Sequence, residues 1–372
     1  MFNRFSQLSL LVLSISFFLC PCIQAADGLS PMTPSECQKD FNFSSEFILK
    51  NDAGIRAKNW DNYPENIQKV INEQNAKITQ VNSIDACKEI TNHFLKSIRK
   101  GHLSLGRKTI SEAITESSTI QSSNLVTTQK LSEQTTLITI PTFDLSVQNQ
   151  LEKIIQDNQN QVLDARYLIL DLRKNSGGFD TSAQPLYPLL GAAEYWFEMP
   201  QIYASTDNIQ SWKETAKTLP DGEIKVEFNR MIGKLESNKN SWVGMKKQKE
   251  EKYVIAHSDV KATPQKVVIL SDEECGSSCE MFILTARQNP NVLVMGRNTY
   301  GALDASNIRT IKTPSQQFTL YYATTFIHRR IGQQIDDIGI PPHIRLAKPQ
   351  NPTEYDAEVK LAQHYLENNL WK

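Results

Sequence analysis

The sequence carries almost no net charge. Its 372 residues include 40 lysines and arginines against 41 aspartates and glutamates, a balance of −1. A nucleic-acid-binding protein needs a basic field that displaces counterions from phosphates, so we expect no nucleic acid as a partner. Glycine and proline are not in excess, at 15 and 16 residues, and no repeat is visible. These absences exclude collagen-like, low-complexity and solenoid architectures, and the 40% hydrophobic content suits a folded chain.

No segment is apolar over the roughly 20 residues that a bilayer span needs, so we expect no stable membrane insertion of the mature chain. Residues 8–19 form a shorter apolar run that follows Arg4. This pattern, closed by a small residue, is typical of a secretory signal peptide over residues 1–25. An N-terminal core helix, or a lipoprotein modified at Cys20 or Cys22, fits the pattern less well. We therefore expect an exported protein, either periplasmic or secreted.

Cysteine is scarce. The chain has six, and removal of residues 1–25 would leave four of them, Cys37, Cys87, Cys275 and Cys279. An even number in an exported chain favours disulfides over thiol chemistry. Three pairings are possible, and separation in sequence favours Cys37–Cys87 and Cys275–Cys279. The first would close a loop of about 50 residues, worth roughly 4 kcal/mol. A four-cysteine zinc site is a poorer alternative because paired CxxC spacing is missing.

Hydrophobic periodicity divides the rest of the chain. Residues 33–100 carry apolar side chains at three- and four-residue steps, which predicts helices. Strand-like and helix-like segments then alternate, which predicts an α/β core with a largely parallel sheet. Strands are expected at 136–140, 167–172, 266–270 and 292–295, helices at 181–190, 277–287 and 353–370, and a hairpin over 308–325.

Residues 192–262 interrupt this alternation. They are rich in Lys, Glu, Asn and Gln, with Trp196, Trp212 and Trp242 spaced through them. We interpret this stretch as a largely helical insertion on the surface of the core. Its aromatic residues either line a substrate groove or anchor the insertion to the core.

Motifs for metal or nucleotide chemistry are absent. The sequence has no P-loop, no HExxH, no GxSxG and no closely spaced pair of histidines. We therefore expect neither a metal nor a cofactor.

Two short segments can carry chemistry. Residues 170–178 (LDLRKNSGG) lead from a buried strand into paired glycines, which can expose backbone N–H groups to an oxyanion. Residues 275–280 (CGSSCE) place Ser277 between a strand and a helix, where free N–H groups stabilise negative charge. Both have plainer interpretations: the glycines as an ordinary turn, and Ser277 with Glu280 as a helix capping box.

Together with two later segments, these motifs resemble the carboxyl-terminal processing (tail-specific) protease family. That family includes the tricorn core protease and the repeats of interphotoreceptor retinoid-binding protein. Its members show four motifs in this order: L-D-L-R-x-N-x-G-G, S-x-x-E, G-x-x-T-x-G, and a final motif similar to E-x-x-G-V-x-P-D. Here the matching segments are residues 170–178, 277–280, 296–301 and 336–342. The resemblance covers roughly residues 100–348 and implies a fold related to the crotonase and ClpP folds.

The resemblance also implies a nucleophile and an oxyanion hole. Ser277 matches the family's nucleophilic serine. The oxyanion donors would be the backbone N–H of Ser278 and that of Gly177 or Gly178.

One departure from the family decides the expected general base. Relatives with a Ser-Lys dyad carry a lysine directly after T-x-G, and Ala302 stands there. The tricorn-like branch instead uses a histidine and an acidic residue, which match His102 and Asp336. We expect His102 to accept the hydroxyl proton. We expect Asp336 to orient the His102 imidazole and to raise the pKa of His102. Glu280 and Asp304 are secondary candidates for the acidic role, and Asp337 is adjacent to Asp336.

These observations predict four parts: a signal peptide (1–25), an N-terminal helical domain (26–105), an α/β catalytic core (106–348) with the 192–262 insertion, and a C-terminal helix (349–372). The short stretch between His102 and the first core strand leaves no room for the PDZ domain that many relatives carry. The predicted function is a serine peptidase acting on a protein or peptide through an acyl-enzyme. The alternatives are a catalytically silent homologue that binds an apolar ligand or peptide in the same cleft, and an esterase or amidase. The oligomeric state is open.

Overall fold

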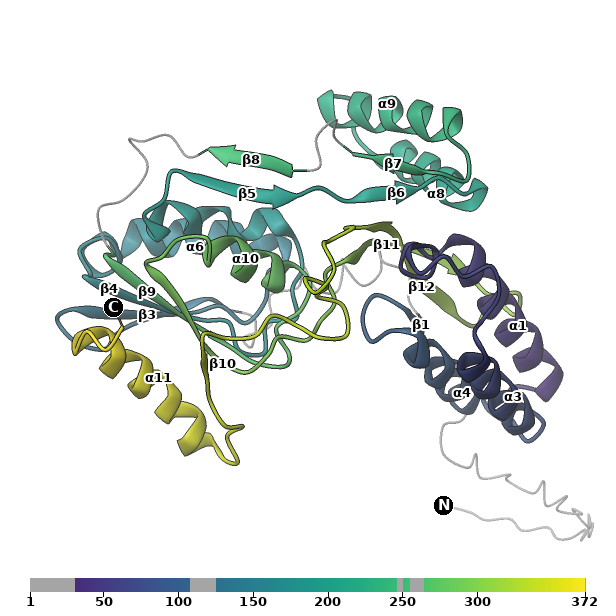
Figure 1. The fold of residues 1–372 in the computed structure, drawn as a ribbon, viewed down its shortest axis with the longest axis horizontal. Coiled ribbons are helices and arrows are strands. Elements are labelled where there is room, and N and C mark those ends of the chain that lie inside the picture. The colour runs from purple at the N-terminus through teal and green to yellow at the C-terminus, as the bar shows by residue number, and fades with distance from the viewer. Residues whose placement is uncertain (1–30, 108–124, 246–249, 255–263, 372) are drawn as a thin grey trace, which may run out of the picture.

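The computed structural model describes residues 31–107, 125–245, 250–254 and 264–371. It has two parts, shown in Figure 1. The core lobe, on the left, is built on a six-stranded sheet, and the N-terminal lobe, on the right, packs helices on a five-stranded sheet. The expected signal peptide lies outside the described residues.

The six-stranded sheet forms the centre of the core lobe. Its strand order is β13-β10-β9-β4-β3-β2, and all neighbours are parallel except β2 and β3. All five residues of β4 are buried, as a nearly continuous apolar run predicts for a strand covered on both faces. The α/β prediction is therefore confirmed. The strands are β2 (Thr127–Lys130), β3 (Thr135–Thr139), β4 (Tyr167–Asp171), β9 (Lys266–Ser271), β10 (Val292–Gly296) and β13 (Ile344–Arg345).

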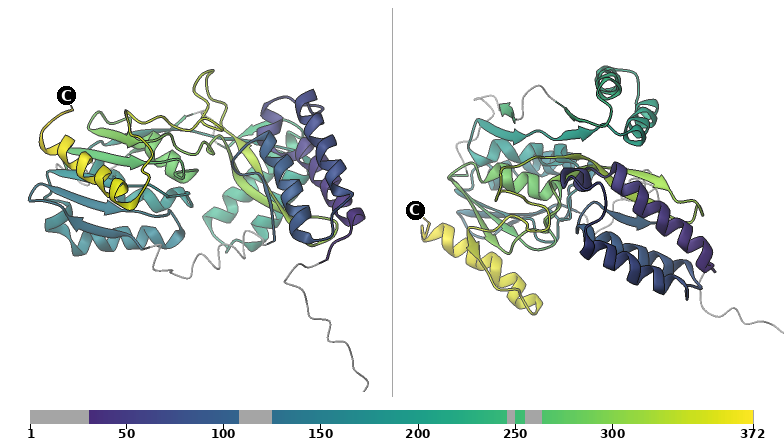
Figure 2. Two further views of the ribbon diagram at one scale, coloured as in Figure 1. Left: turned by 90° about the horizontal axis from the view of Figure 1, so that it is seen from below. Right: turned by 45° about the vertical axis from the view of Figure 1, so that its right-hand side comes forward.

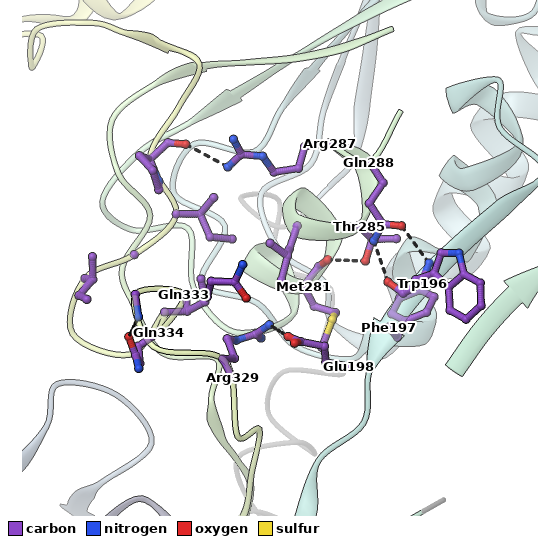
Figure 3. Close-up of a pocket in the computed structure, with 17 residues that line it drawn as sticks. Trp196, Phe197, Glu198, Met281, Thr285, Arg287, Gln288, Arg329, Gln333 and Gln334 are labelled. Atoms are coloured by element: carbon purple, nitrogen blue, oxygen red, sulfur yellow. Dashed lines mark hydrogen bonds and ion pairs between the residues drawn. The ribbon is translucent and has the colours of Figure 1, made fainter. Parts of the chain in front are cut away.

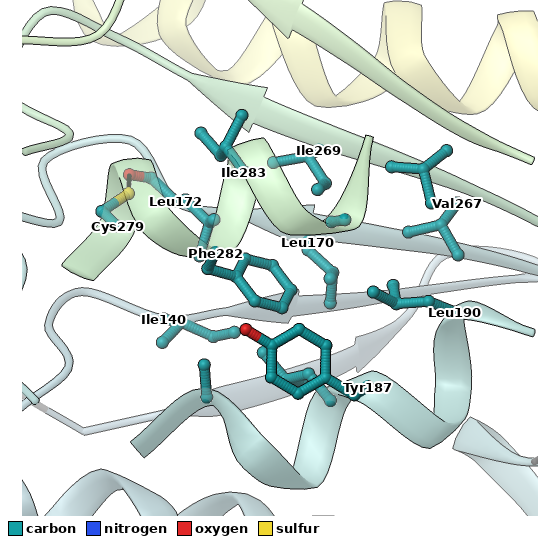
Figure 4. Close-up of a cluster of buried hydrophobic side chains, with 14 of the residues drawn as sticks. Ile140, Leu170, Leu172, Tyr187, Leu190, Val267, Ile269, Cys279, Phe282 and Ile283 are labelled. Atoms are coloured by element: carbon teal, nitrogen blue, oxygen red, sulfur yellow. Dashed lines mark hydrogen bonds between the residues drawn. The ribbon is translucent and has the colours of Figure 1, made fainter. Parts of the chain in front are cut away.

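Helices cover both faces of this sheet. On one face Leu170 packs with Tyr187 and Phe282 (Figure 4), and on the other Ile169 packs with Leu366 of α11. The segment expected as a helix at 181–190 is a 3-10 helix, η2. Two prolines inside it lack the N–H that an α-helix needs there. The elements are α6 (Leu145–Asp157), α7 (Gln159–Val162), η2 (Asp180–Leu190), α10 (Ser278–Ala286) and α11 (Pro352–Glu367).

The N-terminal lobe confirms the helical pattern of residues 33–100. Its helices pack their apolar faces on one another and on β12, and the disulfide Cys37–Cys87 joins α1 to α4. The helices are α1 (Pro34–Asn51), α2 (Ala53–Ala57), α3 (Glu65–Ile78) and α4 (Ile84–Ile98). The sheet beneath them contains β1 (Ser104–Gly106), β6 (Gln201–Tyr203), β7 (Trp242–Gly244), β11 (Ala305–Lys312) and β12 (Thr319–Phe326).

The insertion contains two helices, but strands flank them. β6 and β7 extend the sheet of the N-terminal lobe, and β5 (Glu194–Glu198) pairs with β8 (Glu250–Val254) as a ribbon beside the core. The helices α8 (Thr206–Thr218) and α9 (Glu223–Ser237) pack on β6 and β7, away from the ribbon of β5 and β8 (Figure 2). The buried Trp212 lies against the Arg309 guanidinium of β11, and Trp242 packs on Phe326 of β12, so these two tryptophans anchor the insertion to the N-terminal lobe. Among the described residues, no helix is long and apolar enough to cross a bilayer.

Candidate active site

Ser277 sits at a strained turn between β9 and α10. Its backbone has φ 57° and ψ −120°, a combination that residues with a side chain rarely adopt. Such strain costs about 1–3 kcal/mol and persists only where the surrounding structure enforces it. A serine on a tight strand-to-helix turn exposes its hydroxyl at the start of the helix, which suits a nucleophile.

The disulfide Cys275–Cys279 spans this turn, and both cysteines are fully buried. The backbone on either side is also fixed, because Tyr300 N–H donates to Cys275 O at 2.8 Å and Gly276 N–H donates to Asn175 O at 3.2 Å. The Ser277 turn is thus tied covalently to α10 and by hydrogen bonds to two neighbouring loops.

Glu280 holds the Ser277 turn from inside the protein. Its buried carboxylate accepts hydrogen bonds from Ser277 N–H at 3.0 Å, Gly301 N–H at 2.7 Å, Ala302 N–H at 2.8 Å and the Thr299 hydroxyl at 2.6 Å. Burial raises the pKa of Glu280, and these hydrogen bonds oppose that rise. The carboxylate therefore joins the serine turn to the T-x-G turn and faces backbone donors rather than His102.

The paired glycines lie directly against Ser277. A Cβ atom added at Gly177 would come within 2.9 Å of Ser277 Cβ and 3.0 Å of Ser278 N, so only glycine fits. Gly177 N–H already donates to Asn175 Oδ1 at 2.9 Å. Among the described residues, the N–H groups of Gly178 and Ser278 have no acceptor. Of the two glycines that the sequence left open, Gly178 is therefore the one whose N–H has no acceptor in the described part of the chain.

His102 lies between α4 and β1 with a left-handed backbone, φ 55°. Its Nδ1 is 2.6 Å from Ala305 O, and because a carbonyl only accepts, Nδ1 carries the proton and Nε2 is free to accept one. Burial lowers the pKa of His102 to about 4, with a smaller lowering from Arg99, while the hydrogen bond to Ala305 and the charge of Asp52 oppose the shift. The expected upward shift is therefore wrong in direction, because desolvation of the imidazolium dominates.

The backbone around Ala302 brings His102 and Ser277 into one neighbourhood. A Cβ added at Gly101 would lie only 2.1 Å from Ala302 Cβ, so the His102 segment packs directly on Ala302. The Ala302 N–H shares Glu280 Oε2 with the Ser277 N–H. The segment that carries His102 thus packs against Ala302, the residue that follows the T-x-G turn.

Asp336 binds backbone rather than imidazole. Its carboxylate accepts from the N–H groups of Leu303 at 2.8 Å, Asp304 at 2.7 Å and Ala305 at 3.0 Å. Burial, with the charge of Asp304, raises the pKa of Asp336 to about 6. The partner of His102 Nδ1 is the Ala305 carbonyl, so Asp336 reaches His102 through Ala305. A backbone acceptor of this kind leaves no signal in the sequence.

Asp304, the other acidic candidate, is also occupied. It pairs with the Arg329 guanidinium and accepts from the N–H groups of Ile335 at 2.7 Å and Asp336 at 3.1 Å. Arg329 in turn pairs with Glu198 of β5. These contacts connect the insertion to the loop that carries Asp336.

A cleft of about 610 Å³ runs along the outer side of α10 (Figure 3). Its wall along α10 runs from Met281, four residues after Ser277, to Gln288, whose amide binds the backbone of Trp196, and neither Ser277 nor His102 is among its lining residues. Most of its lining is apolar, with Arg287 and Arg329 at its edges. The sequence had suggested a groove lined by Trp196, Trp212 and Trp242, and only the first of them lines this cleft.

Comparison with known proteins places this site in a family. The model of peptidase family S41 matches residues 134–346, more than half of the chain. The structure of mature CPAF complexed with lactacystin aligns with a TM-score of 0.61 and 12% identity, over 90% of this chain and 100% of that one. A putative peptidase from Parabacteroides merdae ATCC 43184 aligns with a TM-score of 0.54 and 13% identity, over 89% and 96%. No curated protein matches. The structural similarities show a shared fold, and the family match shows that the chain belongs to peptidase family S41 and is a serine-type peptidase.

Proposed function

We propose that this chain is an exported peptidase that hydrolyses peptide bonds through an acyl-enzyme on Ser277, with His102 as the general base. The observation that carries the proposal is the Ser277 turn. A strained serine stands at the start of α10, braced by the Cys275–Cys279 disulfide, beside two backbone N–H groups that have no acceptor among the described residues.

In the first half of the reaction, Ser277 Oγ attacks the carbonyl carbon of the scissile bond and His102 Nε2 accepts the hydroxyl proton. The imidazolium returns this proton to the leaving nitrogen as the C–N bond breaks, which leaves an ester on Ser277. In the second half, His102 takes a proton from water, the resulting hydroxide attacks the ester, and the proton returns to Ser277 Oγ. Atoms and charge balance without a cofactor.

The oxyanion of each tetrahedral intermediate would be stabilised by the N–H groups of Gly178 and Ser278. The positive end of the α10 dipole lies at the same point and adds to this stabilisation. Gly177 serves as the close-packed neighbour that lets these donors converge, since its own N–H is engaged by Asn175.

Asp336 takes part through the backbone. By binding three consecutive N–H groups it fixes residues 303–305, and with them the carbonyl that holds His102 Nδ1–H. We therefore assign Asp336 a positioning role, in place of direct contact with the imidazole.

Substrate recognition and export complete the proposal. The apolar cleft along α10 starts one turn from Ser277 and would accept apolar side chains of an extended peptide. Two disulfides in a chain with a secretory pattern at its N-terminus support an oxidising, exported location.

The proposal is tested with a fluorophosphonate probe, which phosphonylates activated serines. The parent protein should be labelled and Ser277→Ala should not, because the attacking oxygen is gone. Ser237→Ala, at the end of α9, is a control that should label like the parent. Labelling that survives in Ser277→Ala would refute the nucleophile, and the absence of labelling in the folded parent would favour the silent homologue.

A further inference from the structure

The backbone of His102 is held by one buried guanidinium. Arg99 Nη1 donates to Gly101 O and Arg99 Nη2 donates to His102 O at 3.1 Å. His102 has a positive φ, which a residue with a side chain adopts only at a cost. The two hydrogen bonds clamp the carbonyls on either side of this strained residue and thereby fix the direction in which the imidazole leaves the backbone.

Arg99 is itself fixed by Asp52, at the junction of α1 and α2. The ion pair measures 2.6 Å from Nη2 to Oδ2, and the two side chains are only 3% and 0% exposed. Asp52 also accepts from the N–H groups of Ile55 at 3.1 Å and Ala323 at 3.0 Å, so it is anchored to α2 and to β12. The ion pair is therefore a rigid link from the N-terminal lobe to His102.

Gly54 leaves just enough space for this link. A Cβ added at Gly54 would lie 2.8 Å from Arg99 Nε and 3.2 Å from the Cβ of Ala305, the residue that accepts the hydrogen bond of His102. The same small space thus contains the guanidinium that holds the His102 backbone and the residue that orients its ring.

A buried ion pair is weak evidence for stability, because desolvation of the two charges offsets their attraction. Its specific contribution here is geometric. The planar guanidinium donates in several fixed directions at once, to one carboxylate and two carbonyls, and a lysine ammonium cannot reproduce that pattern.

We propose that Arg99 and Asp52 form the positioning pair of the general base, and that through them the N-terminal lobe is a working part of the active site. The pair holds the strained His102 backbone so that Nδ1–H reaches Ala305 O and Nε2 stays available for the proton of Ser277. This inference rests on the proposed function, in which His102 is the base.

The test measures the inactivation of the full chain by a fluorophosphonate at a series of probe concentrations. This separates the probe's binding constant KI from kinact, the rate constant of the chemical step. Gly54→Ala should lower kinact by about 10–100-fold with little change in KI, because the methyl group displaces Arg99 and Ala305. Alanine favours a helix more than glycine does, which offsets part of the strain, so the thermal unfolding midpoint of Gly54→Ala should fall much less than its loss of kinact would suggest.

Matched controls separate positioning from stability. Gly233→Ala, in α9, adds a methyl with no atom within 4 Å and should leave kinact unchanged. Arg99→Lys and Asp52→Asn should each lower kinact by about 100-fold, and the double variant should be no slower than the worse single one. Asp40→Asn removes an equally buried carboxylate that binds Thr313 and Ser315, away from His102, and should cost stability without lowering kinact.

The outcomes are distinguishable. If His102→Ala labels as fast as the parent, the proposed function fails, and this inference fails with it. If His102→Ala is slow while Gly54→Ala and Arg99→Lys react like Gly233→Ala, the positioning role alone is refuted. The positioning role is also refuted if Asp40→Asn, which is destabilised, loses as much kinact as Arg99→Lys and Asp52→Asn do at the same loss of stability. If Arg99→Lys does not fold, Gly54→Ala and Asp52→Asn decide.

Discussion

His102 and Asp336 are both partly buried and both bind the backbone of Ala305, and burial shifts their pKa values in opposite directions. Desolvation disfavours the charged form of each, so the pKa of His102 falls to about 4 and that of Asp336 rises to about 6. The imidazole is therefore neutral, and competent as a base, over the whole range in which Asp336 titrates. The groups that act on them are Arg99 and Asp52 for His102, and Asp304 and Arg99 for Asp336.

This ordering predicts how the rate depends on pH. Below about pH 6 the Asp336 carboxyl gains a proton and loses acceptor capacity toward the backbone of residues 303–305, so kcat/KM should fall. Protonation of His102 should add a second fall near pH 4.

The variant Asp336→Asn isolates the two steps. Its kcat/KM should be lower than the parent's at neutral pH and should show no step near pH 6, because position 336 then has no carboxyl to titrate. A step near pH 6 that persists in Asp336→Asn, or a parent midpoint above 6.5, would contradict the assignment.

Glu280 is a residue whose loss should affect stability and activity together. In Glu280→Gln an amide NH₂ would face N–H and hydroxyl donors that now bind a carboxylate. Leaving one such buried donor unpaired costs about 1–3 kcal/mol, and the Ser277 turn would loosen. Chemical denaturation and probe labelling measure the two effects. Glu236→Gln, which alters an exposed ion pair with Lys213, is the matched control and should cost under about 1 kcal/mol.

At the scale of elements, the two disulfides have different consequences. Cys37–Cys87 closes a span of 50 residues between α1 and α4, whereas Cys275–Cys279 closes a span of 4 across the nucleophile turn. Loop entropy gives roughly 4 kcal/mol for the first and about 2 kcal/mol for the second.

Replacing each disulfide by two alanines should therefore affect stability and activity in opposite order. Cys37→Ala with Cys87→Ala should lower the thermal unfolding midpoint more, and Cys275→Ala with Cys279→Ala should lower kinact more, because the strained φ of Ser277 loses its brace. Equal effects of both double variants on kinact would contradict a specific role for the second disulfide.

At the scale of the whole molecule, the site is assembled from two lobes. Ser277, Gly178 and Glu280 belong to the core lobe, while His102 follows α4 of the N-terminal lobe and leads into its sheet. β11 begins at Ala305, so this strand connects the His102 acceptor with the sheet of the N-terminal lobe.

This construction explains how far the sequence could predict the structure. The core strands were predictable because burial on both faces leaves continuous apolar runs, as in β4 and β9. The strands β6 and β7 were not, since they are only three residues long and β6 pairs with β12, more than a hundred residues away. The candidates Ser277 and His102 came from motifs. The roles of the Ala305 carbonyl and of the Arg99 hydrogen bonds to the His102 backbone could not be predicted from the sequence. Any residue supplies a carbonyl, and an arginine in a helical segment usually faces solvent.

The measurement that tests the account most directly is fluorophosphonate inactivation of His102→Ala beside the parent. Loss of the base should lower kinact by about 100–10,000-fold and leave KI nearly unchanged, because imidazole acts only in the chemical step. His364→Ala, on the exposed side of α11, should react like the parent. A His102→Ala variant that keeps the parent's kinact would contradict the claim that the N-terminal lobe supplies the base to Ser277.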